Sequence, residues 1–179
     1  GVCTVANLNA PGQVVISGDL PSLDAAETAA KARGIRRATR LPVAGAFHSE
    51  IMAPGAQRLA AALEGVEVMT PSMPVVSNVT AEPTTDPATI RANLVAQVTS
   101  PVRFVDCVQA ARALGVEATL EVAPGRVLSS LVRRIEPELE AHAADSAEAI
   151  EELAIQAPAV RQQALEKPEA GHAGLGGAV

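Results

Sequence analysis

The sequence predicts an α/β protein, either one domain or parts of two small ones, and three observations support this. Short runs of β-branched residues alternate with segments whose apolar residues recur at helical spacing. The 179 residues are 48% hydrophobic and 19% charged, which is typical of a globular protein. Aromatic residues make up only 1%, so the core must be built from Ala, Val, Leu and Ile.

The first elements expected are two strands and a helix. The strands cover residues 2–8 and 14–17, and Pro11 followed by Gly12 is the order that a type II turn prefers. The helix is expected over residues 19–34, because Asp or Ser can cap its start, Pro fits its first turn and Gly ends it.

A third strand is expected over residues 35–43, which gives the order strand, strand, helix, strand. This is a β-α-β-β-α-β unit without its first strand and helix. We therefore expect residues 1–43 to form a partial ferredoxin-like small subdomain. Because a natural fold rarely begins inside such a unit and the sequence has no initiator Met, we also expect the chain to be part of a longer protein.

Residues 44–140 are expected to form a second α/β part. Its expected elements are a helix from Ser49 or Pro54 to Gly65, a strand over 74–79, helices that begin at Asp86-Pro87 and Ser100-Pro101, a buried strand over 118–122 and a helix after Pro124-Gly125. The side chains expected to face inward are Leu59, Leu63, Ile90, Leu94, Phe104, Val108, Val127, Leu128, Leu131 and Val132. Residues 141–179 are expected to be a mostly disordered tail with one short helix near 147–155.

Composition excludes several classes of function. The net charge of -6 and the near absence of aromatic residues argue against a nucleic-acid partner. No apolar run is long enough to span a membrane. Three scattered histidines and two distant cysteines form no metal motif, and no cofactor is predicted. The favoured interpretation of Cys3 and Cys107 is two buried thiols in a reducing cytoplasm, although a disulfide is possible.

Four polar residues could carry chemistry. His48 follows an expected strand in a loop of small residues, where it could serve as general base for a hydroxyl or thiol. Taken alone, a loop histidine is more often structural or solvated. Asn7 and Asn9 alternate along a strand and so share a face, where they could line a site or satisfy turn backbone groups. Gln97 interrupts an apolar helix face and needs a hydrogen-bond partner.

Five segments, in one order, resemble the malonyl-CoA:acyl carrier protein transacylase family. They are N-L-N-A-P-G-Q-V-V-I-S-G at 7–18, L-P-V and A-F-H-S within 41–49, P-V-V-S-N-V at 74–79, the helix and break at 94–102, and E-V-A-P-G-R-V-L at 121–128. In the last segment Ala123 stands where the family has Gly. Each segment alone is a weak signal, but their shared order is specific.

The resemblance implies the C-terminal part of an α/β-hydrolase-like large subdomain with the ferredoxin-like small subdomain inserted. It also implies ping-pong transfer of a malonyl group from coenzyme A to the phosphopantetheine thiol of acyl carrier protein, in fatty acid biosynthesis in the cytoplasm. The partners implied are therefore malonyl-CoA and acyl carrier protein, with neither a cofactor nor a metal.

The resemblance also assigns roles to residues of this chain. His48 would be the base and acid of both half-reactions, and Gln97 would orient its ring through a backbone carbonyl, as Asp does in a triad. Asn9, together with Asn7 and Val127, would line the substrate pocket. Phe47 would fill the volume of an α-methyl group, which favours malonyl over methylmalonyl substrates.

The family's nucleophile, the serine of a G-H-S-x-G elbow, has no counterpart here, since the sequence contains no G-x-S-x-G. The arginine that pairs with the malonyl carboxylate is also missing. We therefore expect the chain alone to transfer no malonyl group. The alternatives are the acyltransferase domain of a polyketide synthase, a non-catalytic remnant that docks a carrier protein, and an unrelated α/β domain in which His48 is structural.

Overall fold

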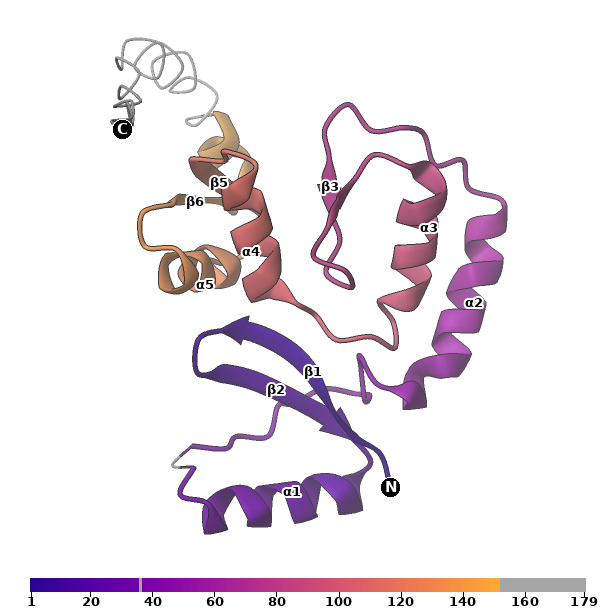
Figure 1. The fold of residues 1–179 in the computed structure, drawn as a ribbon, viewed down its shortest axis with the longest axis vertical. Helices are drawn as coiled ribbons and strands as arrows, with labels where there is room; N and C mark the ends of the chain where they lie inside the picture. The colour runs from indigo at the N-terminus through magenta and orange to yellow at the C-terminus, as the bar shows by residue number, and fades with distance from the viewer. Residues whose placement is uncertain (36, 152–179) are drawn as a thin grey trace, which may run out of the picture.

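The computed structural model describes residues 1–35 and 37–151, in which helices and strands are mixed (Figure 1). The elements are β1 (Cys3–Ala10), β2 (Gln13–Gly18), α1 (Leu20–Ala32), the 3-10 turn η1 (Glu50–Met52), α2 (Ala53–Glu64), β3 (Val75–Val76), β4 (Pro83–Thr84), α3 (Pro87–Ala96), α4 (Phe104–Ala113), β5 (Ala118–Val122), α5 (Val127–Ile135) and β6 (Glu140–Ala144). The sheets β1-β2 and β3-β4 are antiparallel, and β5-β6 is parallel. The α/β class is confirmed, whereas the division into two subdomains stays a prediction.

The β1–β2 hairpin forms as predicted and contacts α1 (Figure 1). Gly12 has a φ of 74° in its turn, the left-handed conformation that the third position of a type II turn requires. The pairing register shifts at Ala6 and at Asn9, so β1 carries two bulges. Gly18 ends β2 so close to β1 that an added Cβ would lie 1.9 Å from the Val2 carbonyl oxygen.

Local signals fix the starts of α1 and α3. The Asp19 carboxylate caps α1 by accepting the main-chain N–H of Ser22 at 2.9 Å, and Asp86 caps α3 by accepting that of Thr89 at 2.8 Å. Hydrogen bonds from the main-chain N–H groups of Val2 and Ser22 lower the pKa of Asp19 to about 2. Both helix starts are thus where the sequence predicts them.

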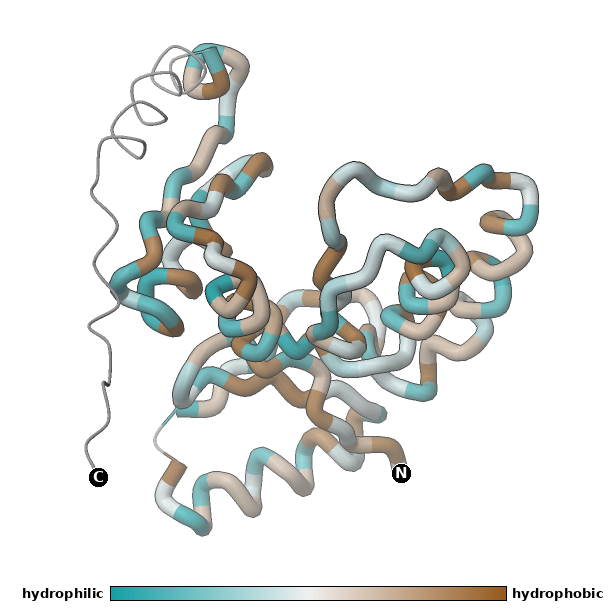
Figure 2. Tube along the Cα trace, turned by 45° about the horizontal axis from the view of Figure 1, so that its top comes forward, coloured by the Kyte–Doolittle hydropathy of each residue, from teal (hydrophilic) through white to brown (hydrophobic). Residues whose placement is uncertain are grey.

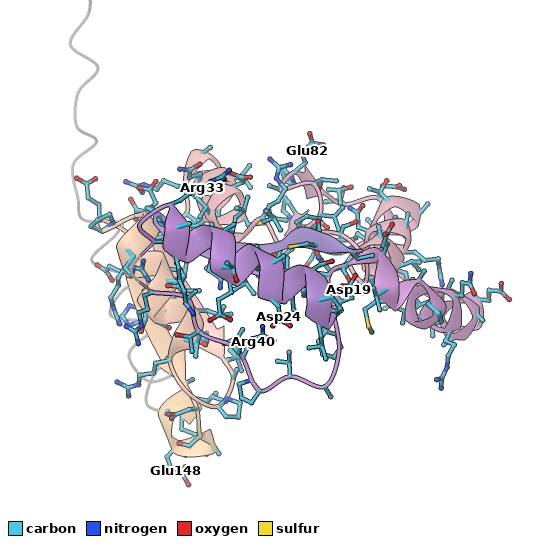
Figure 3. The ribbon with its side chains drawn as sticks, turned by 90° about the horizontal axis from the view of Figure 1, so that it is seen from below. Asp19, Asp24, Arg33, Arg40, Glu82 and Glu148 are labelled. Carbon is cyan, nitrogen blue, oxygen red and sulfur yellow. The ribbon has the colours of Figure 1, made fainter. Side chains whose placement is uncertain are left out.

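Residues 37–43 are irregular, so the predicted strand over 35–43 is wrong. A strand needs a neighbour that takes up its main-chain hydrogen bonds, and no described strand pairs with this segment. Arg40 instead ties the segment to α1, because its guanidinium pairs with the carboxylates of Asp24 and, at 3.4 Å, Glu27. Figure 3 shows Arg40 and Asp24 close together beside α1.

The helices α2 and α3 pack side by side (Figure 1). Arg91 of α3 joins them, because its guanidinium donates to the carbonyls of Leu63 and Val66 at the C-terminal end of α2. The strand predicted over 74–79 shortens to the two residues of β3, which pair with β4. Leu94, predicted to face inward, is instead about half exposed.

Helix α4 begins at Phe104, three residues after the predicted start at Pro101. Val102 forms a parallel β-bridge with β1. Its N–H donates to the Ala6 carbonyl and its carbonyl accepts the Leu8 N–H, both at 2.8 Å. This long-range pairing holds the chain extended, so the helix cannot begin until the bridge has ended.

The buried core lies around α4, α5 and β6. Val108, Val132, Leu139 and Ala141 form its buried cluster, and Phe104, Val116 and Ile135 pack against it. Figure 2 shows hydrophobic stretches of the trace in the interior and also on the outer loop between α2 and β3. Many hydrophobic residues therefore lie outside this buried cluster.

Three expectations for this region need correction. The sequence predicts no strand at β6, which includes residues 141–144 of the predicted disordered tail. β5 is not a buried strand: only Glu121 of it is buried, because a two-stranded sheet covers few of its side chains. In α5, Leu131 and Val132 are buried as expected, but Val127 is 67% exposed and Leu128 also faces solvent.

Two further expectations concern the end of the chain and membranes. Residues 147–151 are helical, and the rest of the helix predicted near 147–155 lies outside the described residues. Across the described ranges, no helix combines the length and the apolar character that a membrane span needs.

Candidate functional site

The segment around His48 is anchored to the C-terminal end of α3. The His48 main-chain N–H donates to the carbonyl of Val98 at 3.2 Å, and its ring Nδ1 lies 2.9 Å from the carbonyl oxygen of Gln97. His48 has a φ of 61°, which is uncommon for a residue with a Cβ and recurs at functional sites. The next residue, Ser49, is fully buried, and its hydroxyl donates to Ala46 at 2.6 Å.

The contact with Gln97 fixes the tautomer of the His48 ring. A carbonyl oxygen only accepts, so Nδ1 must carry the proton. In the neutral ring Nε2 then has a free lone pair, as a general base requires. The contact between the Gln97 backbone carbonyl and the His48 ring, which the family resemblance implies, is thus present in the structure, although the contact by itself does not make His48 catalytic.

The side chain of Gln97 has partners of its own. Its amide donates to the carbonyls of Ser100 at 2.9 Å and Pro101 at 3.4 Å. The amide nitrogen also lies 3.5 Å from His48 Nδ1, but both its protons are used and Nδ1 is itself a donor. The bond from Nδ1 to the backbone carbonyl is therefore the one that orients the ring.

The predicted pair Asn7 and Asn9 lies on β1, which the Val102 bridge places beside the loop after α3. Both side chains are half-buried. The bulge at Asn9 interrupts the strict alternation from which a shared face was predicted. Among the described residues, no hydrogen bond joins either amide to His48, so the structure brings their strand near the histidine without connecting the side chains.

Of the other predicted residues, Phe47 lies near His48 and Val127 does not share its surroundings. The Phe47 ring is about half exposed and covers Gly45, where an added Cβ would lie 3.7 Å from it. Val127 is the first residue of α5, a helix that packs against β6, β1, β5 and α4. The structure therefore groups His48, Phe47 and Gln97 and leaves Val127 on a separate element.

The two thiols differ from the expectation of two buried cysteines. Cys3 is exposed and Cys107 is half-buried, and both are free. Burial raises the pKa of Cys107, which keeps it a thiol and a weak nucleophile. No group of three or more His, Cys, Asp or Glu residues in the described part of the chain is placed to hold a metal.

Sequence reasoning missed several groups near this site. The carbonyls of Val98, Ser100 and Pro101 are main-chain groups, which no side-chain pattern reveals. A hollow of about 230 Å³ also lies between α3 and the β3–β4 pair. Its lining includes Val76, Asn78, Ile90, Asn93, Leu94 and Gln97. The buried amide nitrogen of Asn93 has no hydrogen-bond partner in the described part of the chain.

The sequence matches the family model described as "acyl transferase domain" over residues 2–165. It is 43% identical to the malonyl CoA-acyl carrier protein transacylase of Bacillus subtilis over 152 residues, which cover 85% of this chain and 48% of that protein. The corresponding Escherichia coli K12 protein is 41% identical over 142 residues, or 79% of this chain and 46% of that protein. The chain thus spans about half the length of these curated relatives.

Solved structures of proteins with similar names also match this chain. An acyl-carrier-protein-S-malonyltransferase from Bartonella henselae superposes with a TM-score of 0.80 and 38% identity, covering 86% of this chain and 49% of that one. A malonyl-transacylase in complex with its type II PKS acyl-carrier protein gives a TM-score of 0.79 and 40% identity, with 86% and 50% covered.

Proposed function

Because this chain belongs to the acyl transferase domain family, we propose that it carries the histidine part of the active site of a malonyl-CoA:acyl carrier protein transacylase. The observation that carries the proposal is the 2.9 Å contact between His48 Nδ1 and the Gln97 carbonyl oxygen. It supports the tautomer that a serine hydroxyl needs in its base. The relatives named malonyl CoA-acyl carrier protein transacylase support the choice of malonyl-CoA and acyl carrier protein as substrates.

In the proposed reaction, His48 Nε2 takes the proton of a serine hydroxyl as the serine oxygen attacks the malonyl thioester. The carbon–sulfur bond breaks, and the protonated ring returns the proton to the leaving thiolate of coenzyme A. In the second half the ring takes the proton of the carrier protein's phosphopantetheine thiol, whose sulfur attacks the malonyl-serine ester. The serine oxygen leaves and recovers that proton from His48.

We further propose that the 179 residues alone transfer no malonyl group, because their sequence supplies no G-x-S-x-G serine. Phe47, beside His48, supports a malonyl rather than a methylmalonyl substrate, and Asn7, Asn9 and Val127 remain proposed pocket residues. The proposed setting is fatty acid biosynthesis in the cytoplasm. The relative in complex with a type II PKS carrier protein favours polyketide synthesis as the alternative setting.

The test is a chimera in which this chain replaces the matching half of the Bacillus subtilis relative. We expect the chimera to load acyl carrier protein from malonyl-CoA, and we expect His48→Ala to lower kcat/KM by about a thousandfold or more, as losses of a catalytic base do. His142→Ala is the matched control, because the side chain of this exposed histidine pairs, among the described residues, with Glu140 alone, at 3.5 Å. Full activity of the His48→Ala chimera would make His48 structural and refute the proposal.

A further inference from the structure

The carbonyls at the C-terminal end of α3 divide into two groups. The last carbonyls of a helix have no partner within it and must find one elsewhere. The Val95 and Ala96 carbonyls accept local N–H groups, from Val98 at 3.3 Å and from Ser100 at 3.0 Å. The next two carbonyls, of Gln97 and Val98, are taken by His48, one by its ring and one by its main chain.

His48 therefore makes a two-point contact with consecutive carbonyls, which we call the carbonyl pair (Gln97 and Val98). Its left-handed backbone is unfavourable for a residue with a Cβ and persists only when the surroundings fix it. The carbonyl pair supplies that fixation, because it holds the main-chain N–H and the ring at once. The ring direction consequently depends on where these two carbonyls stand.

The carbonyl pair is fixed from both sides. On one side it continues α3. On the other side the chain reaches Val102, whose N–H and C=O both bond to β1 at 2.8 Å. Between these two anchors the Gln97 side chain closes the loop, because its amide donates to the carbonyls of Ser100 and Pro101.

We propose that the Gln97 side-chain amide is a positioning residue for His48. It acts through the loop it closes: it keeps the carbonyl pair in place, and the carbonyl pair holds the Nδ1–H tautomer and the direction of Nε2. This role is distinct from that of the Gln97 backbone carbonyl, which any residue would supply. The inference rests on the proposed function, in which Nε2 is the base.

The first test reads the tautomer directly and needs no catalysis. The chain is labelled with ¹⁵N-histidine, and long-range ¹H–¹⁵N correlation spectra are recorded under alkaline conditions, where imidazoles are neutral. The His48 signals are identified by their loss in His48→Ala. We expect the Nδ1–H form in the unmodified chain and a mixture of both tautomers in Gln97→Met, which keeps the side-chain length and removes the donor.

Thr99→Val is the matched control, because it deletes a hydroxyl in the same loop that bonds, within the described part of the chain, only to the Ala96 carbonyl at 3.4 Å. It should leave the Nδ1–H form intact. If Gln97→Met does not fold, Gln97→Glu tests the same contacts, since a carboxylate repels the two carbonyls. An unchanged Nδ1–H tautomer in a folded Gln97 variant would overturn the inference.

The second test separates this inference from the proposed function. In the chimera, Gln97→Met should lower kcat about tenfold and leave KM unchanged, while Thr99→Val should change neither. If His48→Ala leaves the chimera active, the proposed function fails, yet the tautomer experiment still decides whether the amide holds the ring. If the tautomer changes and kcat does not, positioning by this amide has no role in the reaction and the inference is wrong.

Discussion

At the scale of single residues, His48 and Gly12 adopt the same left-handed backbone conformation for different reasons. His48 is left-handed with a Cβ and depends on bonds to the carbonyl pair. Gly12 is left-handed without one and needs no such support. The conformation is unfavourable for His48, where tertiary contacts stabilise it. Gly12 has no Cβ and adopts the same conformation without steric strain.

Gly12 and Gly65 form a matched pair for measuring that cost. An added Cβ meets nothing within 4 Å at either glycine, but Gly12 has φ 74° and Gly65 has φ -88°. Gly12→Ala should lower the free energy of unfolding by about 1 kcal/mol, and Gly65→Ala should leave it unchanged or raise it by up to about 1 kcal/mol. Urea denaturation measures both, and equal effects would contradict this explanation.

At the scale of elements, helix α5 takes its N-terminal cap from a strand. Its own N-cap residue, Arg126, makes no side-chain cap. The buried Glu121 carboxylate of β5 instead accepts the main-chain N–H groups of Leu128 at 3.0 Å and Ser129 at 2.8 Å, and the Ser129 hydroxyl at 2.8 Å. These bonds, chiefly that from the Ser129 main chain, lower the pKa of Glu121.

The lowered pKa of Glu121 predicts acid sensitivity. Its contribution to stability is present above the ordinary glutamate pKa of 4.5 and is lost as the pH falls through the lower pKa of the folded state. Glu121→Gln should remove this contribution at neutral pH and flatten the loss of stability on acidification. Glu117→Gln is the control, because Glu117 is exposed. Urea midpoints across this pH range measure the effect, and parallel curves for all three proteins would rule it out.

At the scale of the whole molecule, the buried cluster around α4, α5 and β6 is small, and many large apolar side chains lie outside it. Leu94 and Leu131 are both predicted to face inward, and the structure divides them: Leu94 is about half exposed, whereas Leu131 is buried. The difference follows from their elements, because α5 packs against β1, β5, β6 and α4, whereas Leu94 of α3 borders the open hollow between α3 and the β3–β4 pair.

Stability should therefore depend strongly on the buried cluster. Leu139 is 2% exposed within it, so Leu139→Ala should lower the free energy of unfolding by about 2–5 kcal/mol through lost contacts and a cavity. Leu114→Ala, at an exposed leucine, should change it by less than about 0.5 kcal/mol. Urea denaturation compares the two variants. Similar losses would show that the cluster is not the stabilising core.

Features that depend on neighbours along the chain were predictable from the sequence. The Asp19 and Asp86 caps act over three residues, and the Pro11-Gly12 turn and the ends of α1 and α2 depend on a few adjacent residues. Local hydrogen bonds and allowed φ angles decide these features, so residue types alone reveal them. The sequence thereby determined the α/β class, most helix limits and His48 as the candidate base.

Features that depend on distant partners were decided only by the tertiary structure. The sequence of β6, E-A-H-A-A, has no strand pattern, and it becomes a strand because β5 pairs with it. Residues 37–43 have a strand-like sequence and form none, because no described strand pairs with them. The carbonyl pair meets His48 across 49 residues through main-chain atoms, which every residue type carries. Hydrogen bonds between backbone groups far apart in the chain leave no mark on residue type, so folding alone sets them.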